Sequence, residues 1–392
     1  MTETLKVRPT TGSAALQWAV SGGGHRPAED AGQHACGWLH LDDVSFECGV
    51  LLPRVRVYFE TWGRLNAAAD NAVVVCHALT GDAHAGDGGG RPGWWSGLIG
   101  PGRAIDTDRY FVIASNVIGG CAGSTGPSDL AEDGRPYAMR FPAVTVRDMV
   151  AVQMRLLDAL GVREVALVIG GSLGGMQAWE WAVMAAGRVR HTIAIAAHPA
   201  FPPLGIGYNE AMRMAIMADA DWQNGEYYGT GRTPQAGLAA ARAIGMLTYR
   251  TDLLFEERFG RRTAEAAEGA LASPRFLVES YLRHQGDKLN RRFDANSYLY
   301  LTRAMDSHDI GRGRGGIEAA LRQVRGRLTV IGIDTDYLYA PRDLRRAARL
   351  AADCGVASRY RELSSKYGHD AFLIEFEPLS RMVEEALRES GR

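Results

Sequence analysis

The sequence predicts an α/β fold, with a mostly parallel, doubly wound sheet and an inserted helical cap. Over the first 200 residues, short apolar runs alternate with segments whose apolar residues recur at helical spacing. The alternation stops from about 202 to 316 and resumes before the C-terminus. Strands that alternate with helices are typical of a doubly wound sheet, because parallel neighbours need crossover connections. The length of 392 residues suits such a core with a sizeable insertion.

The apolar runs are the expected strands: 54–59, 71–76, 110–114, 165–169, 191–197, 328–333 and 359–363. The segments with helical spacing are the expected helices: 145–160, 176–182, 209–217, 235–248, 273–285 and 341–352. The stretch 366–370 is expected to open a last helix. Residues 1–35 are rich in Gly, Ala, Thr and Ser without a sustained period, which predicts a loosely held extension.

Ser172 lies in a Gly-Gly-Ser-Leu-Gly pentapeptide (170–174), between an apolar run and a helical segment. A serine at a sharp strand-to-helix turn needs small neighbours, because its backbone is strained and the helix passes close to the strand. The turn also places the serine at a helix N-terminus, where free N–H groups stabilise an oxyanion. The pattern therefore predicts a nucleophile elbow. Its alternative, in a chain with 47 glycines, is an ordinary loop.

The other members of a catalytic triad follow in the order of the α/β-hydrolases, with an acid after a later strand and then a histidine. Asp334 and Asp336 follow the strand expected at 328–333, so either carboxylate would lie at the carboxyl edge of the sheet, where ligands bind. At least one of them is expected to satisfy the turn or cap the next helix instead. His369 lies in a Gly-flanked loop and is hard to explain as core filling. Its neighbour Asp370 is either a helix N-terminal acid or a pocket residue.

These motifs divide the chain into three parts. The extension covers 1–35, the core comprises 36–201 and 317–392, and the helical insertion covers 202–316. Because the insertion lies between the nucleophile and the acid, it is expected to cover the site as a cap that shapes the pocket and limits water. The alternative is an ordinary second helical domain with no part in catalysis.

The composition disfavours several other classes of function. A net charge of −1 gives no electrostatic case for nucleic acid or an anionic membrane, which favours a small-molecule substrate. The five cysteines are odd in number and lack a C-x-x-C pair, so they suggest neither a disulfide framework nor a zinc site. No apolar run approaches the roughly 18 residues of a membrane span, and no signal-peptide pattern opens the chain. We therefore expect a cytoplasmic protein.

Many short motifs occur along the chain in one order: Cys76-His-Ala-Leu-Thr-Gly81, Gly93-Trp-Trp95, Ser115-Asn-Val-Ile-Gly-Gly-Cys121, Gly123-Ser-Thr-Gly-Pro127, Gly170-Gly-Ser-Leu-Gly-Gly-Met-Gln177, Leu247-Thr-Tyr-Arg250, Arg292-Phe-Asp-Ala-Asn-Ser-Tyr298 and Tyr367-Gly-His-Asp-Ala-Phe372. With them the chain resembles the homoserine O-acetyltransferases of the α/β-hydrolase superfamily, which serve methionine biosynthesis. The likeness runs from about 54 to 378. It implies a homodimer formed through the cap and, as co-substrate, acetyl-CoA, with no bound cofactor or metal.

The resemblance also implies roles for residues at matching positions. Ser172 resembles the nucleophile that takes an acyl group from acyl-CoA, and His369 resembles the base. Asp336 matches the acid of the triad, which would hold the histidine tautomer. The oxyanion hole would consist of the backbone N–H groups of Leu173 and Leu79.

The resemblance extends to the amino-acid acceptor. Arg242 and Asp370 match acceptor-binding positions, the guanidinium suiting an α-carboxylate and the carboxylate an α-ammonium. Tyr249 is assigned to the same substrate-binding group. The glycine-rich stretch 86–91 departs from the family pattern and is expected to be flexible.

Donor and acceptor remain open at this point. Relatives that use succinyl-CoA carry an arginine two residues after the triad aspartate, whereas this chain has Leu338, which favours acetyl-CoA. Some relatives acylate serine, and one methylene is worth only roughly 1–3 kcal/mol of discrimination. Homoserine O-succinyltransferase and serine O-acetyltransferase activities are therefore alternatives. A carboxylesterase or thioesterase would use the same triad without needing the acceptor-binding charges.

Overall fold

The computed structural model describes residues 34–263 and 276–391. An eight-stranded sheet has the strand order β1-β2-β6-β3-β7-β8-β9-β10. Its strands are β1 (His34–Ser45), β2 (Leu51–Trp62), β3 (Ala72–Cys76), β6 (Phe111–Ser115), β7 (Val165–Gly171), β8 (His191–Ile195), β9 (Arg327–Ile333) and β10 (Ser358–Leu363). β1 and β2 pair antiparallel with their neighbours, and the strands from β6 to β10 run parallel. A separate pair, β4 (Ile99–Gly100) and β5 (Ile105–Asp106), is also parallel.

The central strands β3, β6, β7 and β8 are buried on both faces, and their alternate side chains point to opposite sides of the sheet. In β3, Val74 and Cys76 belong to one apolar cluster, whereas Val73 and Val75 belong to the other. The first cluster is completed by α1 (Val146–Ala159), α2 (Leu173–Met184), α8 (Ile317–Leu321) and α9 (Pro341–Asp353). The second is completed by α10 (Phe376–Ser390) and the segment 95–105. The sheet is therefore a middle layer with one core on each side.

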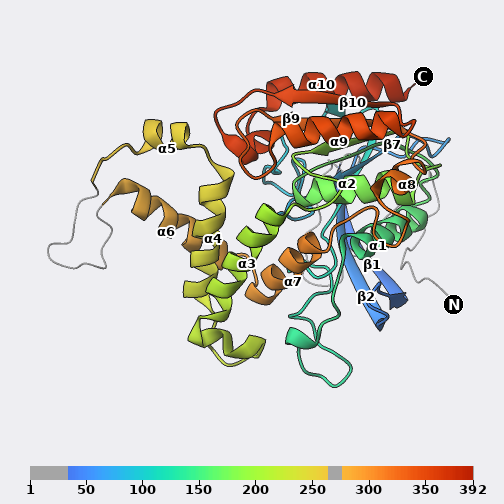
Figure 1. Ribbon diagram of the computed structural model, residues 1–392. Coiled ribbons are helices and arrows are strands. Elements are labelled where there is room, and N and C mark those ends of the chain that lie inside the picture. The colour runs from blue at the N-terminus through green and yellow to red at the C-terminus, as the bar shows by residue number, and fades with distance from the viewer. Residues whose placement is uncertain (1–33, 264–275, 392) are drawn as a thin grey trace.

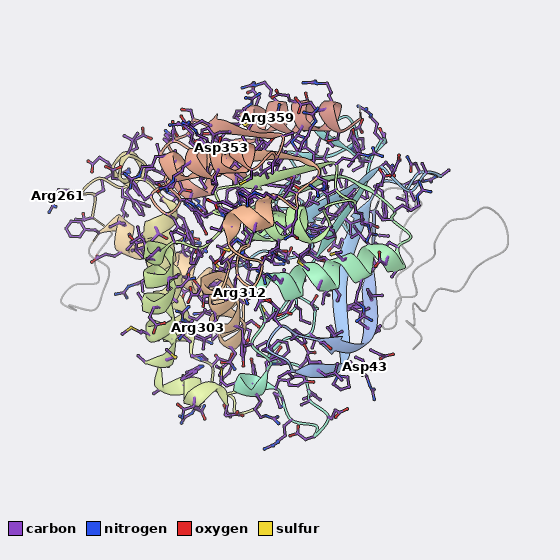
Figure 2. The ribbon with its side chains drawn as sticks, turned by 45° about the vertical axis from the view of Figure 1, so that its right-hand side comes forward. Asp43, Arg261, Arg303, Arg312, Asp353 and Arg359 are labelled. Carbon is purple, nitrogen blue, oxygen red and sulfur yellow. The ribbon has the colours of Figure 1, made fainter. Side chains whose placement is uncertain are left out.

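Within 202–316, where the sequence predicts a helical insertion, the described residues form five α-helices. They are α3 (Pro203–Met217), α4 (Gln235–Tyr249), α5 (Asp252–Arg258), α6 (Leu277–Asn290) and α7 (Ala295–Asp306). Figure 1 shows them gathered on one side of the sheet. α4 packs against α3 and α6, and α7 packs against α3. We call these helices the cap. Figure 2 shows charged side chains at the outside of the ribbon, including Arg303 of α7 and Asp353 of α9.

The expected strands are present with small shifts at their ends, and so are most of the expected helices. The helix expected at 209–217 begins earlier, at Pro203, and the helix expected at 273–285 is found at Leu277–Asn290, while 273–275 lie outside the described residues. Two other expectations are wrong. The sequence assigns 1–35 to an extension, whereas β1 begins at His34, so His34 and Ala35 belong to the sheet; the rest of the extension, 1–33, lies outside the described residues. The stretch 366–370 does not open the last helix. Residues Gly368–Leu373 form a separate 3-10 turn, η3, which ends because Ile374 leaves helical backbone angles before α10 begins.

The remaining short elements are η1 (Ala138–Arg140) and η2 (Ala220–Gly225). Among the described helices, none has the length and apolar character that crossing a membrane would need.

Candidate active site

Ser172 lies at the sharp turn between β7 and α2. Its φ of 58° and ψ of −123° fall in a region that side-chain-bearing residues rarely adopt, so its backbone is strained. The turn is possible because glycines stand at 170, 171 and 174: a Cβ at Gly174 would collide with the carbonyl oxygen of Cys76. Strained backbone at a strand-to-helix turn is the geometry of a nucleophile elbow.

His369 and Asp336 form a buried pair beside this turn. His369 lies in η3, and Asp336 lies just after β9. The distance from His369 Nδ1 to Asp336 Oδ2 is 2.8 Å. Because a carboxylate only accepts hydrogen bonds, Nδ1 carries the proton and donates, which leaves the lone pair of a neutral imidazole on Nε2. Nε2 is buried and has no hydrogen-bond partner among the described residues, so it is available to act as a base.

The structure distinguishes the two candidate acids. The other oxygen of Asp336, Oδ1, accepts hydrogen bonds from the backbone N–H groups of Leu338 and Tyr339, at 2.8 and 3.0 Å. Asp334 instead accepts hydrogen bonds from the Ser364 hydroxyl and the Ser365 N–H, at 2.7 and 2.9 Å. Asp336 therefore faces the imidazole, whereas Asp334 satisfies the turn.

Three aromatic rings enclose the imidazole of His369. The Tyr339 ring stacks on it with a centroid separation of 5.2 Å and an interplanar angle of 20°. Tyr249 lies at 5.7 Å, and Phe372 meets the imidazole edge-on at 5.7 Å. The rings and the hydrogen bond to Asp336 hold the histidine in one orientation.

The surroundings of His369 also change its basicity. Burial alone would lower the pKa of the imidazole, but the Asp336 carboxylate, which bonds to it, and the charge of Asp370 outweigh burial. The pKa of His369 therefore lies above its ordinary value of 6.5. A raised pKa makes the imidazole a stronger base, provided that the pH is high enough to deprotonate it.

A cavity of about 380 Å³ opens above these residues. It brings together six residues to which the resemblance assigns roles: Ser172, His369, Leu79, Arg242, Tyr249 and Asp370. Leu173 follows the nucleophile as the first residue of α2, so its N–H has no partner within the helix and is free to donate to an oxyanion. Leu338 is not among the lining residues; it is 8% exposed and packs in the apolar core.

The cavity wall is rich in charge. Arg242 of α4 lies against the Tyr249 ring, with its guanidinium carbon 5.8 Å from the ring centroid. Asp370 pairs with Arg250 at 3.0 Å. Arg292 donates to the carbonyl oxygen of Thr80 at 2.6 Å. Cationic and anionic groups thus stand in one cavity, an arrangement suited to a zwitterionic ligand.

Nine lining residues have no role in the sequence-based prediction, among them the charged Asp82, Lys288 and Arg292 and the indole of Trp94. Trp94 and Arg292 lie inside the motifs quoted above, but a motif does not say which of its side chains faces a cavity. Lys288 and Arg292 come from the end of α6 and the residues that follow it, so only the packing of the cap on the core reveals their position.

Three polar contacts tie the cap to the loops that carry the acid and the base. Thr251 donates its hydroxyl to the carbonyl oxygen of Lys366 at 2.6 Å, and the Lys366 ammonium lies 2.5 Å from Glu257. The Tyr337 hydroxyl donates to Asp252 at 2.7 Å. Together with the Arg250–Asp370 pair, these contacts link the segment 250–257 to both catalytic loops.

A second hollow, of about 680 Å³, lies where several strands begin, at the opposite edge of the sheet. Its charged residues include Arg190, Arg327 and Glu389. Although this hollow is larger, it contains no serine–histidine pair, and parallel sheets bind ligands at their carboxyl edge.

Comparisons with known proteins show the fold and the family of this chain. The alpha/beta hydrolase fold family matches residues 71–376. A homoserine O-acetyltransferase from Symbiobacterium thermophilum is 49% identical over 352 residues, covering 86% of this chain and 91% of the relative. A homoserine O-acetyltransferase from Carboxydothermus hydrogenoformans is 46% identical over 349 residues, covering 87% of this chain and 92% of the relative. This chain belongs to the homoserine O-acetyltransferase family.

Solved structures place the family beside esterases. The homoserine O-acetyltransferase from Bacillus anthracis superposes with a TM-score of 0.84 at 27% identity, covering 91% of this chain and 98% of that chain. Esterase E22 superposes equally well, with a TM-score of 0.84 at 28% identity, covering 90% of this chain and 100% of that chain. A protein named as an acetyltransferase and one named as an esterase thus share this fold.

Proposed function

We propose that this protein is a homoserine O-acetyltransferase. It transfers the acetyl group of acetyl-CoA to the hydroxyl of L-homoserine, through an acetyl-Ser172 intermediate, and releases CoA and O-acetyl-L-homoserine. The observation that carries the proposal is the pair formed by His369 and Asp336 beside Ser172, in a cavity that also contains Arg242 and Asp370. Ser172, His369 and Asp336 would carry out acyl transfer. Arg242 and Asp370 would provide charges complementary to those of an amino acid.

In the first half-reaction, His369 Nε2 accepts the hydroxyl proton of Ser172 as Oγ attacks the thioester carbonyl carbon. The carbonyl oxygen becomes an oxyanion, which receives hydrogen bonds from the N–H groups of Leu173 and Leu79. Collapse of the tetrahedral intermediate breaks the C–S bond, and the imidazolium returns its proton to the CoA thiolate. Asp336 stabilises the imidazolium while it exists.

In the second half-reaction, His369 Nε2 removes the proton of the homoserine hydroxyl, whose oxygen attacks the acetyl-Ser172 carbonyl. Collapse releases the product ester and returns the proton to Ser172 Oγ. Arg242 binds the α-carboxylate of homoserine, and Asp370 binds its α-ammonium. Asp370 keeps its bond to Arg250, because a carboxylate has about four lone-pair sites for donors.

Acetyl-CoA is the proposed donor. Succinyl-CoA would bring a second carboxylate, and the residue two positions after Asp336 is the apolar Leu338. Leu338 packs in the core and does not line the cavity. Its argument for acetyl-CoA is therefore only that it provides no positive charge to pair with a succinyl carboxylate. L-serine remains the alternative acceptor, since the two amino acids differ by one methylene.

Hydrolysis is the alternative reaction, because water attacking acetyl-Ser172 would make the enzyme an esterase or thioesterase. The specific support for it is the equal structural similarity to esterase E22. The charged pair Arg242 and Asp370 favours transfer, because an oriented acceptor hydroxyl outcompetes water.

We further propose a cytoplasmic homodimer that works in methionine biosynthesis, with small molecules as its only substrates and no bound cofactor. Large apolar side chains are exposed on the cap: Leu204, Met214 and Met217 on α3 and Leu247 on α4. A second copy of the chain is the proposed partner of this face.

Thiol release from acetyl-CoA tests the function. Purified protein is assayed with L-homoserine, with L-serine and without acceptor, and succinyl-CoA is the parallel donor. Homoserine-dependent release with acetyl-CoA supports the proposal, and Ser172→Ala abolishes it. Equal release without acceptor identifies a hydrolase instead, and a preference for serine or succinyl-CoA changes the assigned substrate.

A further inference from the structure

Two histidines and a glutamate meet at one point outside the active-site cavity. His34 Nε2 and His84 Nδ1 each lie 2.8 Å from the same oxygen of Glu60, Oε2. The three potential ligand atoms all lie within 4.8 Å of one another. None of the three residues lines the cavity that contains Ser172.

Two residues of this cluster, His34 and Glu60, lie on the antiparallel strands β1 and β2. Cys36 pairs with Glu60, and His34 pairs with Trp62. Directly opposed residues share a face, and so do residues two apart on one strand, so His34 and Glu60 lie on the same face. His84 reaches them from the loop that follows β3. The cluster therefore joins two strands to a loop that is distant in the sequence.

The cluster is enclosed. The side chains of Glu60 and His84 are 2% and 7% exposed, and that of His34 is 22% exposed. Gly88, in the glycine-rich stretch 86–91, packs so closely that a Cβ there would lie 2.6 Å from the His34 ring. This stretch forms a turn closed by two backbone hydrogen bonds between Gly88 and Arg91, at 3.2 and 3.1 Å.

The hydrogen bonds of His84 are the informative feature. Nδ1 faces the Glu60 carboxylate, and Nε2 lies 3.2 Å from the carbonyl oxygen of Arg91, so both ring nitrogens face acceptor oxygens. A neutral imidazole has one N–H and satisfies only one of them. With the proton on Nε2, the lone pair on Nδ1 points at a carboxylate, and a cation between them, either a second proton or a metal ion, satisfies both. Histidine ligands of metals typically donate their other N–H to a carbonyl oxygen in this way.

The carboxylate is also oriented. Glu60 Oε1 accepts a hydrogen bond from the Tyr58 hydroxyl at 3.1 Å, and the Arg91 guanidinium lies 4.0 Å from the same oxygen. These contacts hold Oε1 and leave Oε2 for the two histidines. Hydrogen-bonded carboxylates of this kind support metal ligands from the outside.

We propose that His34, Glu60 and His84 form a zinc-binding site. Two imidazole nitrogens and one carboxylate oxygen are a ligand set that Zn²⁺ takes, whereas Ca²⁺ and Mg²⁺ prefer oxygen alone. Tetrahedral bonds of roughly 2.0–2.2 Å put neighbouring ligand atoms about 3.3 Å apart, so each histidine nitrogen needs to move away from Glu60 Oε2 by only about half an ångström. The two nitrogens, which lie within 4.8 Å of each other, need to reach the same spacing. The fourth position faces the exposed side of His34 and is filled by water.

The site stabilises the loop that forms the cavity wall. His84 ends the stretch that carries Leu79 and Asp82, both of which line the cavity, and the Trp94 indole donates to the carbonyl oxygen of Asp82 at 3.1 Å. Zinc would fasten this loop to β1 and β2 and raise the free energy of unfolding. It takes no part in the chemistry at Ser172, so the inference stands apart from the proposed function.

Direct metal binding tests the site. Full-length protein is dialysed against a chelator, and Zn²⁺ is then titrated in by calorimetry. One equivalent per chain is expected, with a rise in Tm, and Co²⁺ in its place gives visible absorption bands of tetrahedral coordination. His84→Ala and His34→Gln remove one ligand each, which is expected to weaken affinity by more than the roughly 10- to 100-fold loss that follows the removal of an outer-shell partner.

His40→Gln is the matched control, because His40 is an exposed histidine on the same strand, outside the cluster. It should bind Zn²⁺ like the unaltered protein. Absence of stoichiometric binding by the unaltered protein overturns the proposal, and so does equal binding by His34→Gln and His40→Gln. Should His84→Ala not fold, His34→Gln decides, since its side chain lies at the open end of the cluster.

Discussion

Replacing Asp336 by asparagine tests the proposed catalytic geometry most sharply. In the native site, the backbone N–H groups of Leu338 and Tyr339 hold one carboxylate oxygen, and His369 Nδ1–H donates to the other. In Asp336→Asn, the amide oxygen is expected to keep the two backbone hydrogen bonds, which turns the amide NH₂ toward Nδ1. The NH₂ donates, so Nδ1 becomes an acceptor and the proton moves to Nε2, where it abolishes the base.

The magnitude follows from the cost of the alternative arrangement. Turning the amide over restores the correct tautomer but leaves two backbone N–H groups facing an NH₂, at about 1–3 kcal/mol each. The competent state is therefore depleted by roughly 30-fold to 10⁴-fold. Loss of the charge that stabilises the imidazolium adds to this, and comparable substitutions in Ser-His-Asp enzymes lower kcat by about 10⁴. We expect a loss of that order.

The assay is the rate of CoA release with saturating homoserine, together with a single-turnover measurement of Ser172 acetylation. Asp334→Asn is the matched control, because Asp334 follows the same strand but bonds to Ser364 and Ser365. It should change the rate by no more than a few-fold. If Asp336→Asn lost less than tenfold, or lost no more than Asp334→Asn, the tautomer argument would be refuted.

Three further predictions follow from the site and the fold. Arg242→Ala should lower kcat/KM for homoserine by roughly 10- to 150-fold, the value of about 1.5–3 kcal/mol for a hydrogen bond to a charged group, while Ser172 acetylation by acetyl-CoA stays unchanged in single-turnover experiments. Activity should fall as the pH drops through the raised pKa of His369, with a midpoint above 6.5, because the base must be neutral; Asp370→Asn removes a charge that raises this pKa and should move the midpoint to lower pH. Gly174→Ala should reduce stability by at least the roughly 1–3 kcal/mol of overpacking in urea unfolding, since its Cβ meets backbone.

Each of these has its own control. An equal effect of Arg242→Ala on both half-reactions would contradict its assignment to the acceptor. A pH midpoint that does not move in Asp370→Asn would show that its charge does not reach the imidazole. Gly187→Ala introduces a Cβ into open space and should unfold like the native protein; if Gly174→Ala did the same, the close approach of α2 to the neighbouring loop would be wrong.

The features that the sequence predicts well are those with a local signal. The buried strands are short apolar runs, and Ser172 is marked by its glycine neighbours. The choice between Asp334 and Asp336 rested on a resemblance, because both follow the same strand. Only the direction of their hydrogen bonds separates them on physical grounds.

The features that sequence reasoning missed depend on long-range packing. β1 is an exception: its buried Leu39 and Leu41 alternate with exposed side chains, which is a local signal of a half-buried strand, and its pairing with β2 bears that signal out. Lys288 and Arg292 belong to the cavity only because α6 packs beside α4. His34, Glu60 and His84 are 26 and 24 residues apart, and no local pattern reports that they meet.

The contacts between the segment 250–257 and the loops of Asp336 and His369 limit how far the cap can change independently of those loops. A cap exchanged between two relatives would lose the Thr251–Lys366, Glu257–Lys366, Asp252–Tyr337 and Arg250–Asp370 contacts together unless the partner loops were exchanged with it. We therefore expect the cap, which shapes the substrate pocket, and the loops that position Asp336 and His369 to change together. Chimeras that carry 250–257 and 336–370 from the same parent should retain activity, whereas mixed parentage should lower kcat even where the pocket walls are identical.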